Sequence, residues 1–417
     1  MKSVKFDDFH YGYVIVFCCC LIMGVNVGIV LSCAGIFYQP ISSELGVSVG
    51  TLGLYMSLNY LTSTLMLSVA GKLIDRFSAR VLLTLSSAVL GLTLMAMSIF
   101  QSVWQFYAAG SIIGITLAFL LYLSFPTLVN RWFKVKVGFF FGVCSAASGI
   151  GGMLFNPVGA YLITTYGWRT AYLIFGCVVL LLVTPVLGLL LRDRPQDKGV
   201  AAYGHEAWQR TAASESGLEY VQALKTPAFY GLWVFAFLLV SVSTLNLFIP
   251  HYIVGLGYTL EQASLAAAAV MMGVTIGKIT LGLINDKSSI VGVGVTVLCG
   301  IAGLALLLLG RSGVAVVIVG GFLFGWAYAG VTVQTPMLVR TVFGSKNYAQ
   351  IYSNISIAFA VGGAITAGGW GLAADYTSFV FILSLGITFL VISGAIGFCV
   401  LRVGKISEQV RSKQFLG

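Results

Sequence analysis

A single lysine, Lys278, interrupts one of the long apolar stretches of this chain. It stands in the segment VTIGKITLGLINDK, between Glu261 upstream and Asp286 downstream, with no other charged residue in between. Asp286 follows about eight residues later, which is about 12 Å along a helix at 1.5 Å per residue. An ammonium that deep in a bilayer costs about 2.5 to 3.5 kcal/mol on insertion scales, so such charges usually face a cavity and mark a substrate path.

The sequence offers Lys278 no carboxylate as a partner within the membrane. Glu44, Glu261 and Asp375 stand at the outer ends of apolar stretches, and the remaining acids fall in segments that we expect to be cytoplasmic. Snorkelling to the membrane surface is difficult from this depth. We therefore predict that Lys278 receives the carboxylate of a substrate. A gating role and a role in packing, which includes an intramembrane salt bridge, are the alternatives.

Three asparagines and one histidine are further polar candidates. Asn26, Asn59 and Asn354 lie in the middle of apolar stretches, where an amide must find hydrogen-bond partners, so substrate contacts and bonds between helices both fit. His251 lies in FIPHYIVG at the outer end of a stretch. Histidine titrates near neutral pH, so His251 is a candidate to carry or sense a proton, and a solvated histidine at the rim is the alternative.

The elements that would position these side chains are membrane helices. Of the 417 residues, 59% are hydrophobic and 9% are charged, whereas an ordinary soluble domain has about 25% charged residues. A helix needs about 20 apolar residues to cross about 30 Å of hydrocarbon. We predict twelve such helices, at residues 12–37, 49–70, 80–100, 104–129, 139–164, 168–191, 227–250, 262–284, 290–310, 313–338, 348–372 and 377–401.

The net charge of +10 describes membrane topology rather than a nucleic-acid partner. If alternate loops lie on opposite sides, all 23 Lys and Arg residues fall on one side except Arg169, Arg311 and Lys278 itself. By the positive-inside rule both termini and the loop at 192–226 are cytoplasmic. We expect a multi-pass protein of a prokaryotic inner membrane, whose first span is too long for a signal peptide and is retained.

The composition argues against an enzyme and against a bound cofactor. The eight cysteines all fall inside predicted spans without metal-ligand spacing, and the three histidines are scattered. We therefore predict no metal site, no catalytic residues and no cofactor. No G-x-x-x-x-G-K-[ST] loop for ATP is present.

The two halves of the chain repeat one pattern at an offset of about 210 residues, a repeat length that fits parallel six-helix units. FPTLVNRWFKVK at Phe125 matches TPMLVRTVFGSK at Thr335, and Gly71 with Asp75 matches Gly282 with Asp286. Such repeats form two bundles with a substrate site near the midplane between them. The predicted organisation is a bundle at 1–191, a cytoplasmic linker at 192–226, a second bundle at 227–402 and a tail at 403–417.

Several motifs in this order resemble the major facilitator superfamily of secondary transporters. GKLIDRFSAR at Gly71 is similar to its cytoplasmic loop between helices 2 and 3. The motifs HYGYVIV, RWF, GWR and RDRPQDKG resemble the branch of monocarboxylate porters and oxalate:formate antiporters. The resemblance covers nearly the whole chain. It implies an all-α membrane protein with twelve transmembrane helices in two six-helix bundles, the major facilitator fold.

The resemblance also implies roles for particular residues. Lys278 matches the arginine of this branch that binds the substrate carboxylate, although lysine offers a point charge and not a bidentate fork. Tyr122, Trp326 and Tyr328 resemble an aromatic box around the carboxylate, with packing or interface anchoring as the alternative. The residues implied to form a cytoplasmic gate are Asp75, paired with Arg131 in the outward-open state, together with Gly71, Arg76 and Asp286.

Two departures from the branch bear on coupling. Val274 or its neighbour Gly273 stands where the proton-coupled porters have an aspartate, so the usual proton carrier is missing. The predicted span at 348–372 lacks the second cation that the oxalate:formate antiporter has there. This absence favours a monoanion over a dianion as the substrate.

Together these features predict a secondary active transporter of a small organic anion, a monocarboxylate. Alternating access would move the anion past Lys278, by proton symport or by anion exchange, in a monomer within the lipid bilayer. A carrier of neutral or zwitterionic solutes and a non-transporting channel or sensor of the same fold are the alternatives.

Overall fold

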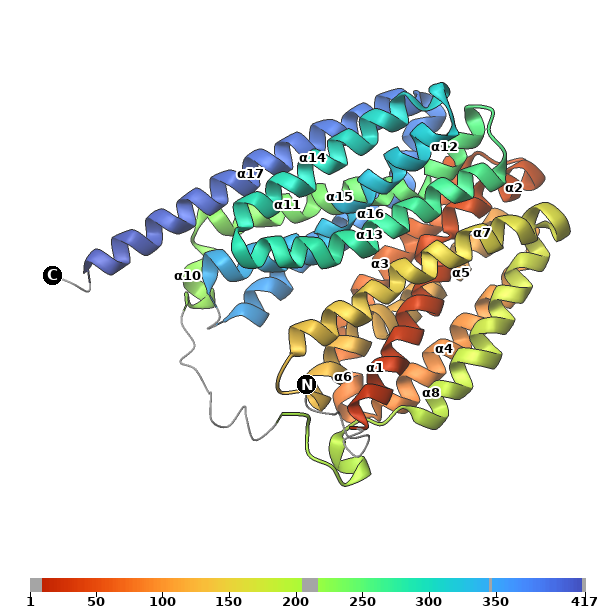
Figure 1. Ribbon diagram of the computed structural model, residues 1–417. Coiled ribbons are helices and arrows are strands. Elements are labelled where there is room, and N and C mark those ends of the chain that lie inside the picture. The colour runs from red at the N-terminus through yellow and green to blue at the C-terminus, as the bar shows by residue number, and fades with distance from the viewer. Residues whose placement is uncertain (1–9, 205–216, 345–346, 415–417) are drawn as a thin grey trace, which may run out of the picture.

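The computed structural model of the protein describes residues 10–204, 217–344 and 347–414. Within these ranges the regular secondary structure is helical, and no β-strand is formed. The helices assemble into two bundles, one from each half of the chain, which lie side by side (Figure 1). The expected all-α membrane fold with two six-helix bundles is confirmed.

The first bundle contains the helices of the N-terminal half and three π-helical segments, η2, η3 and η4. Its elements are α1 (Gly12–Leu21), η2 (Ile22–Ser32), α2 (Ala34–Leu45), α3 (Val49–Arg76), α4 (Ala79–Met97), α5 (Val103–Leu117), η3 (Ala118–Leu123), α6 (Ser124–Trp132), α7 (Val137–Cys177), η4 (Val178–Val183) and α8 (Thr184–Leu190).

The second bundle follows a linker that holds the short elements η5 (Pro195–Lys198) and α10 (Tyr220–Leu224). Its elements are α11 (Pro227–Ser243), η6 (Thr244–Leu247), α12 (Ile249–Gly255), α13 (Leu260–Lys287), α14 (Ser289–Leu308), η7 (Gly310–Ser312), α15 (Val314–Phe343), α16 (Tyr348–Tyr376) and α17 (Phe379–Gln414).

The helices account for the twelve predicted spans. In the described part of the chain, 10 helical stretches are long and apolar enough to cross a membrane. One of them, Val137–Leu190, contains two spans, because Gly167 adopts φ 83° and ψ 159° and ends the first of them. The helix α3, with 28 residues, is a further span outside those 10. Dividing one of the 10 stretches at Gly167 gives eleven spans, and α3 is the twelfth.

Side-chain caps fix where the helices at the bundle interface begin. The Ser48 hydroxyl accepts a hydrogen bond from the backbone N–H of Thr51 at 3.0 Å, which caps α3. Thr259 accepts one from the N–H of Gln262 at 3.2 Å, and Gln262 bonds back to the Thr259 N–H, which forms a capping box on α13. Such caps satisfy backbone donors that have no partner within the helix.

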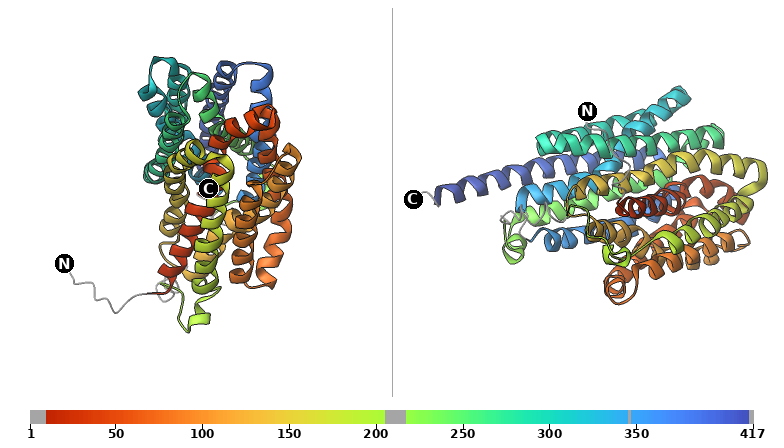
Figure 2. Two further views of the ribbon diagram at one scale, coloured as in Figure 1. Left: turned by 90° about the vertical axis from the view of Figure 1, so that its right-hand side faces the viewer. Right: turned by 60° about the horizontal axis from the view of Figure 1, so that its bottom comes forward.

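The two bundles meet at one end of the molecule and diverge toward the other. The helix α1 begins and α17 ends at the end that also carries α10, which we call the terminal end (Figures 1 and 2). At the opposite end, Gly50 of α3 packs directly on Gly371 of α16, their close approach possible because neither has a side chain. The Ser48 hydroxyl there donates to the Asp375 carboxylate at 2.5 Å. The protein is therefore closed at the opposite end.

The GWR motif ties three helix ends together within the first bundle. Arg169 forms an ion pair with Glu44 and donates to the backbone oxygen of Phe100 at 2.9 Å. Its guanidinium also lies over the ring of Trp168, 4.1 Å from the centroid. This motif therefore has a structural explanation at the opposite end of the bundle.

The RDRPQDKG motif has a similar role at the terminal end. The Asp193 carboxylate accepts hydrogen bonds from the backbone N–H groups of Ala79 at 2.9 Å and Arg80 at 2.7 Å, and so caps α4. Asp197 in turn accepts from the N–H groups of Asp193 and Arg194. A carboxylate at a helix N-terminus is stabilising.

We predict that Gly151→Val destabilises the protein, because a Cβ at Gly151 would collide with the backbone of Gly24 in η2. Such overpacking costs about 1–3 kcal/mol, so the unfolding temperature in detergent should fall by several degrees. Gly142→Val on the same helix is the control, because a Cβ there meets nothing within 4 Å. Equal unfolding temperatures for the two variants would contradict this packing.

Candidate functional site

Lys278 lies on α13, half-buried, and reaches across to α7 of the other bundle. Its ammonium donates to the Ser145 backbone oxygen at 2.8 Å, to the Ser145 hydroxyl at 3.0 Å and to the Ser148 hydroxyl at 3.3 Å. Within the described residues no ion pair joins Lys278 to a carboxylate. The charge is thus held by neutral oxygen atoms of the first bundle.

The helix faces around Lys278 change from contact to separation along their length. On one side of Lys278, Thr275 and Met271 of α13 pack on Gly149 and Gly152 of α7. On the other side, toward the terminal end, Cβ atoms added at Gly138, Gly142 or Gly282 would meet nothing within 4 Å. Within each helix, these residues recur at spacings that match whole helical turns. Those of α7 therefore lie on one face of α7, and those of α13 lie on one face of α13. Lys278 therefore marks the place where α7 and α13 part.

Trp326 on α15 packs against Gly277, the residue before Lys278, and its side chain carries an unused donor. A Cβ on Gly277, the residue before Lys278, would lie 3.3 Å from the Trp326 Cα atom. The indole N–H of Trp326 is buried and has no hydrogen-bond partner in the described structure. A buried donor without a partner costs free energy, so this N–H is the one group of Trp326 whose hydrogen bond the described structure leaves open.

Three tyrosines from both bundles form a second group. Tyr122 on η3 and Tyr328 on α15 are half-buried and lie near each other and near Tyr60 on α3. The ring of Tyr60 lies against α16, 2.5 Å from where a Cβ of Gly363 would be. Tyr60 is a third tyrosine beside Tyr122 and Tyr328. The aromatic box of Tyr122, Trp326 and Tyr328 around a carboxylate stays a prediction.

The three asparagines make hydrogen bonds inside the protein. Asn26 is fully buried and donates to the Ser87 hydroxyl of α4 at 3.0 Å. Asn59 accepts from the Ser63 hydroxyl at 3.3 Å. Asn354 donates to the Gln350 backbone oxygen at 3.0 Å. The bond of Asn26 joins two helices, whereas the bonds of Asn59 and Asn354 stay within one helix each. Substrate contact by any of the three stays a prediction.

His251 on α12 is less solvated than a rim position implies. Its side chain is half-buried, its Nδ1 atom is buried without a hydrogen-bond partner in the described structure, and its ring lies 5.5 Å from that of Phe379. Burial lowers the pKa of His251, and the nearby Asp375 carboxylate opposes that shift. A proton-linked role stays a prediction.

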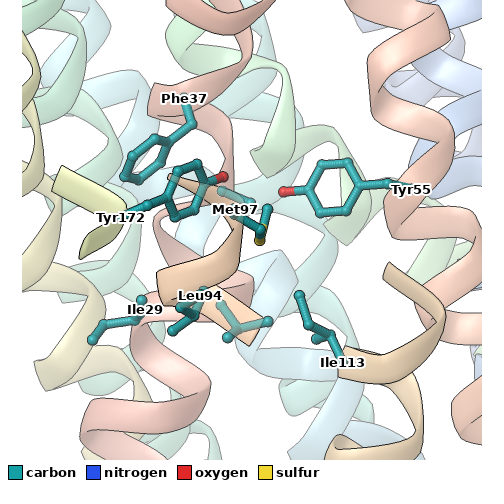
Figure 3. Close-up of a pocket in the computed structure, with 9 residues that line it drawn as sticks. Ile29, Phe37, Tyr55, Leu94, Met97, Ile113 and Tyr172 are labelled. Atoms are coloured by element: carbon teal, nitrogen blue, oxygen red, sulfur yellow. The ribbon is translucent and has the colours of Figure 1, made fainter. Parts of the chain in front are cut away.

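A separate small cavity lies inside the first bundle, away from Lys278. Its volume is about 10 Å³, which is room for about one water molecule. Figure 3 shows the hydroxyl groups of Tyr55 and Tyr172 directed toward each other across it, and Phe37 stacks on Tyr172 at 4.1 Å. This cavity is too small for an organic substrate.

The family model of the Major Facilitator Superfamily matches residues 16–316, which is more than half of the chain. The chain belongs to the Major Facilitator Superfamily. It is therefore a multi-pass membrane transporter of small solutes and not an enzyme.

Similar proteins agree with this membership. The chain is 24% identical over 395 residues to the oxalate:formate antiporter of Oxalobacter formigenes, which covers 89% of this chain and 88% of that one. It is 26% identical over 201 residues to monocarboxylate transporter 4 of Mus musculus, covering 44% and 40% of the two chains. A bacterial homologue of the human lysosomal transporter Spinster, solved in an inward-facing and occupied conformation, superposes with a TM-score of 0.71 at 14% identity, covering 94% and 97%.

The gate residues implied for this superfamily lie at the terminal end of the bundles. Gly71 and Arg76 belong to the last turns of α3, and Asp286 is exposed near the end of α13. Arg131 belongs to the last turn of α6, and the Asp75 side chain lies outside the described part of the structure. The gate stays a prediction.

Ser145, Ser148 and Tyr60 are the site residues that sequence reasoning did not single out. The serines fall within SAASGIGG, a run of small residues that is typical of a helix-packing face. Their position beside Gly149, which Ser148 directly precedes and Ser145 precedes by one turn, is the signal that could have found them. The face that approaches another helix most closely is also the face that can reach its side chains.

We predict that Gly50→Leu opens the end of the transporter that is closed here, because a side chain at Gly50 would overlap the backbone of Gly371. Spin labels placed on α2 and α12 at that end should report longer distances in the variant without substrate. Gly255→Leu is the matched control, since a Cβ on Gly255 meets nothing within 4 Å. Unchanged distances in Gly50→Leu would refute a seal between α3 and α16.

Proposed function

We propose that this protein is a secondary active transporter of a small organic anion, a monocarboxylate, and that Lys278 binds the carboxylate. The observation that carries the proposal is a lysine within a membrane span, at the interface of two bundles. Its hydrogen-bond partners in the described structure are all neutral oxygen atoms. A net positive charge therefore remains at the site until an anion arrives.

The number of carboxylate groups on the expected anion follows from the number of positive charges at the site. No cation is present in the span that contains Asn354, IYSNISIAFAVGGAITAGGW, so a second carboxylate would have no lysine or arginine partner there. A lysine is a compact point charge that suits one carboxylate group. In this proposal Trp326, Tyr122 and Tyr328 would supply further donors to the bound anion, as the resemblance to the aromatic box implies.

The names of relatives support this substrate class. The oxalate:formate antiporter covers most of this chain, and monocarboxylate transporter 4 covers a smaller part. Both names describe carriers of small carboxylates. The missing intramembrane carboxylate at Val274 favours exchange of anions over proton symport as the coupling mode, with His251 as the remaining proton-linked candidate.

Alternating access would be a rocking of residues 1–191 against residues 227–402 in a monomer, with the linker at 192–226 and the tail at 403–417 on the cytoplasmic side. With both termini cytoplasmic, the conformation described above opens inward. The gate of Gly71, Asp75, Arg76, Arg131 and Asp286 would then close the cytoplasmic side after the anion has moved.

Uptake of labelled acetate, lactate and formate into proteoliposomes tests the assignment. We predict that Lys278→Gln lowers uptake of the transported anion about 10- to 100-fold, the loss expected when a hydrogen bond to a charged group is removed. Lys287→Gln is the matched control, because this exposed lysine ends the same helix and should transport at the original rate.

The same assay separates the coupling modes. Uptake that depends on unlabelled anion inside the vesicles indicates exchange, and uptake that rises with an inward proton gradient indicates symport. Full uptake by Lys278→Gln would overturn the anion site. If no carboxylate moves at all, the protein is a carrier of neutral or zwitterionic solutes or a non-transporting sensor.

A further inference from the structure

The ammonium of Lys278 is fully occupied when no substrate is bound. A lysine ammonium has three N–H donors, and three oxygen atoms of α7 lie within hydrogen-bond distance of it, two from Ser145 and one from Ser148. An anion that approaches Lys278 thus meets a charge that is already hydrogen-bonded. It must displace some of these acceptors.

We propose that Ser145 and Ser148 are internal stand-ins for the substrate anion, which compete with it for Lys278 and set the apparent affinity of the carrier. This inference rests on the proposed function and extends it to two residues of the first bundle. The serines hold the ammonium in the empty carrier, and the carboxylate takes their place in the loaded one.

The geometry of α7 suits this role. Ser145 and Ser148 are one turn apart, and the Ser148 hydroxyl also donates to the Ser145 backbone oxygen at 2.9 Å, so the acceptors form one connected group. Gly149 lets Thr275 of α13 pack closely on the next turn. This close approach brings the two serines within reach of Lys278.

The exchange of partners also affects how the bundles are joined. The bonds from Lys278 to the serines cross from α13 to α7, at the point where the two helices begin to separate. Hydrogen bonds to a charged group are about twice as strong as neutral ones. An empty carrier must break them to change conformation, whereas a bound anion has already replaced them. Exchange of anions should therefore be faster than net flux.

The double variant Ser145→Ala and Ser148→Ala tests the competition. Both hydroxyl acceptors are lost while Lys278 and the Ser145 backbone oxygen remain, so the half-saturation concentration for anion uptake should fall about three- to tenfold. The ratio of exchange rate to net uptake rate should fall as well, because the empty carrier returns more easily.

Ser393→Ala is the matched control, since Ser393 is buried in α17 and donates to the Phe389 backbone oxygen of its own helix. This variant should change neither the half-saturation concentration nor the ratio of exchange rate to net uptake rate. Thermal unfolding in detergent checks that each variant is folded. If the double variant is not, Ser148→Ala alone should give a smaller fall, about twofold, in the half-saturation concentration.

An unchanged or higher half-saturation concentration in the double variant, with normal uptake by the unaltered protein, would overturn the competition and leave the proposed function standing. A rise would mean that the serines contact the anion. If the unaltered protein moves no carboxylate, the proposed function fails, and the competition fails with it.

Discussion

The rest of the structure depends on a positive charge that has to be satisfied inside the membrane. Lys278 is in an unbroken helix, so it cannot leave the apolar region by a local change of backbone. An ammonium in hydrocarbon is expensive unless it finds partners. The chain supplies those partners from the opposite bundle, and this makes the interface between α7 and α13 the chemical centre of the protein.

The kind of partner decides what the site can do. A carboxylate beside Lys278 would cancel its charge and leave an ion pair with little need of a ligand. The serine oxygens instead satisfy hydrogen bonds without cancelling the charge. A site of this kind keeps an attraction for anions, while the empty protein avoids an unpaired donor. The same bonds connect the two bundles, so in the proposed mechanism ligand binding and relative movement of the bundles share one set of contacts.

The spans could be predicted from the sequence because hydropathy and length alone determine whether a helix crosses the bilayer. The position of Lys278 within one continuous helix was predictable for the same reason, since Lys278 and Asp286 belong to the same apolar stretch. The partners Ser145 and Ser148 were not, because the register between α7 and α13 is set by contacts between distant segments. Local periodicity carries no information on that register.

The motifs likewise differ in what the sequence predicts: residue types within one segment can be predicted, and contacts between segments far apart in the chain cannot. The motif around Asp193 identified the family branch, yet its contact with the first turn of α4 depends on how residues far apart in the chain fold back. The tyrosine Tyr60 was likewise hidden, since its neighbours Tyr122 and Tyr328 come from other helices. Side-chain chemistry could thus be predicted wherever one helix sufficed, and it required the structure wherever two helices meet.

The most direct test of the central claim is to locate a bound anion. A crystal of the protein soaked with a bromine-bearing monocarboxylate, such as 3-bromopropionate, would reveal the bromine by its anomalous scattering and the carboxylate beside it. We expect a carboxylate oxygen within about 3 Å of the Lys278 Nζ atom, a normal hydrogen-bond distance, with Ser145 and Ser148 displaced from it. An ordered anion elsewhere, with the bonds from Lys278 to the serines intact, would contradict it.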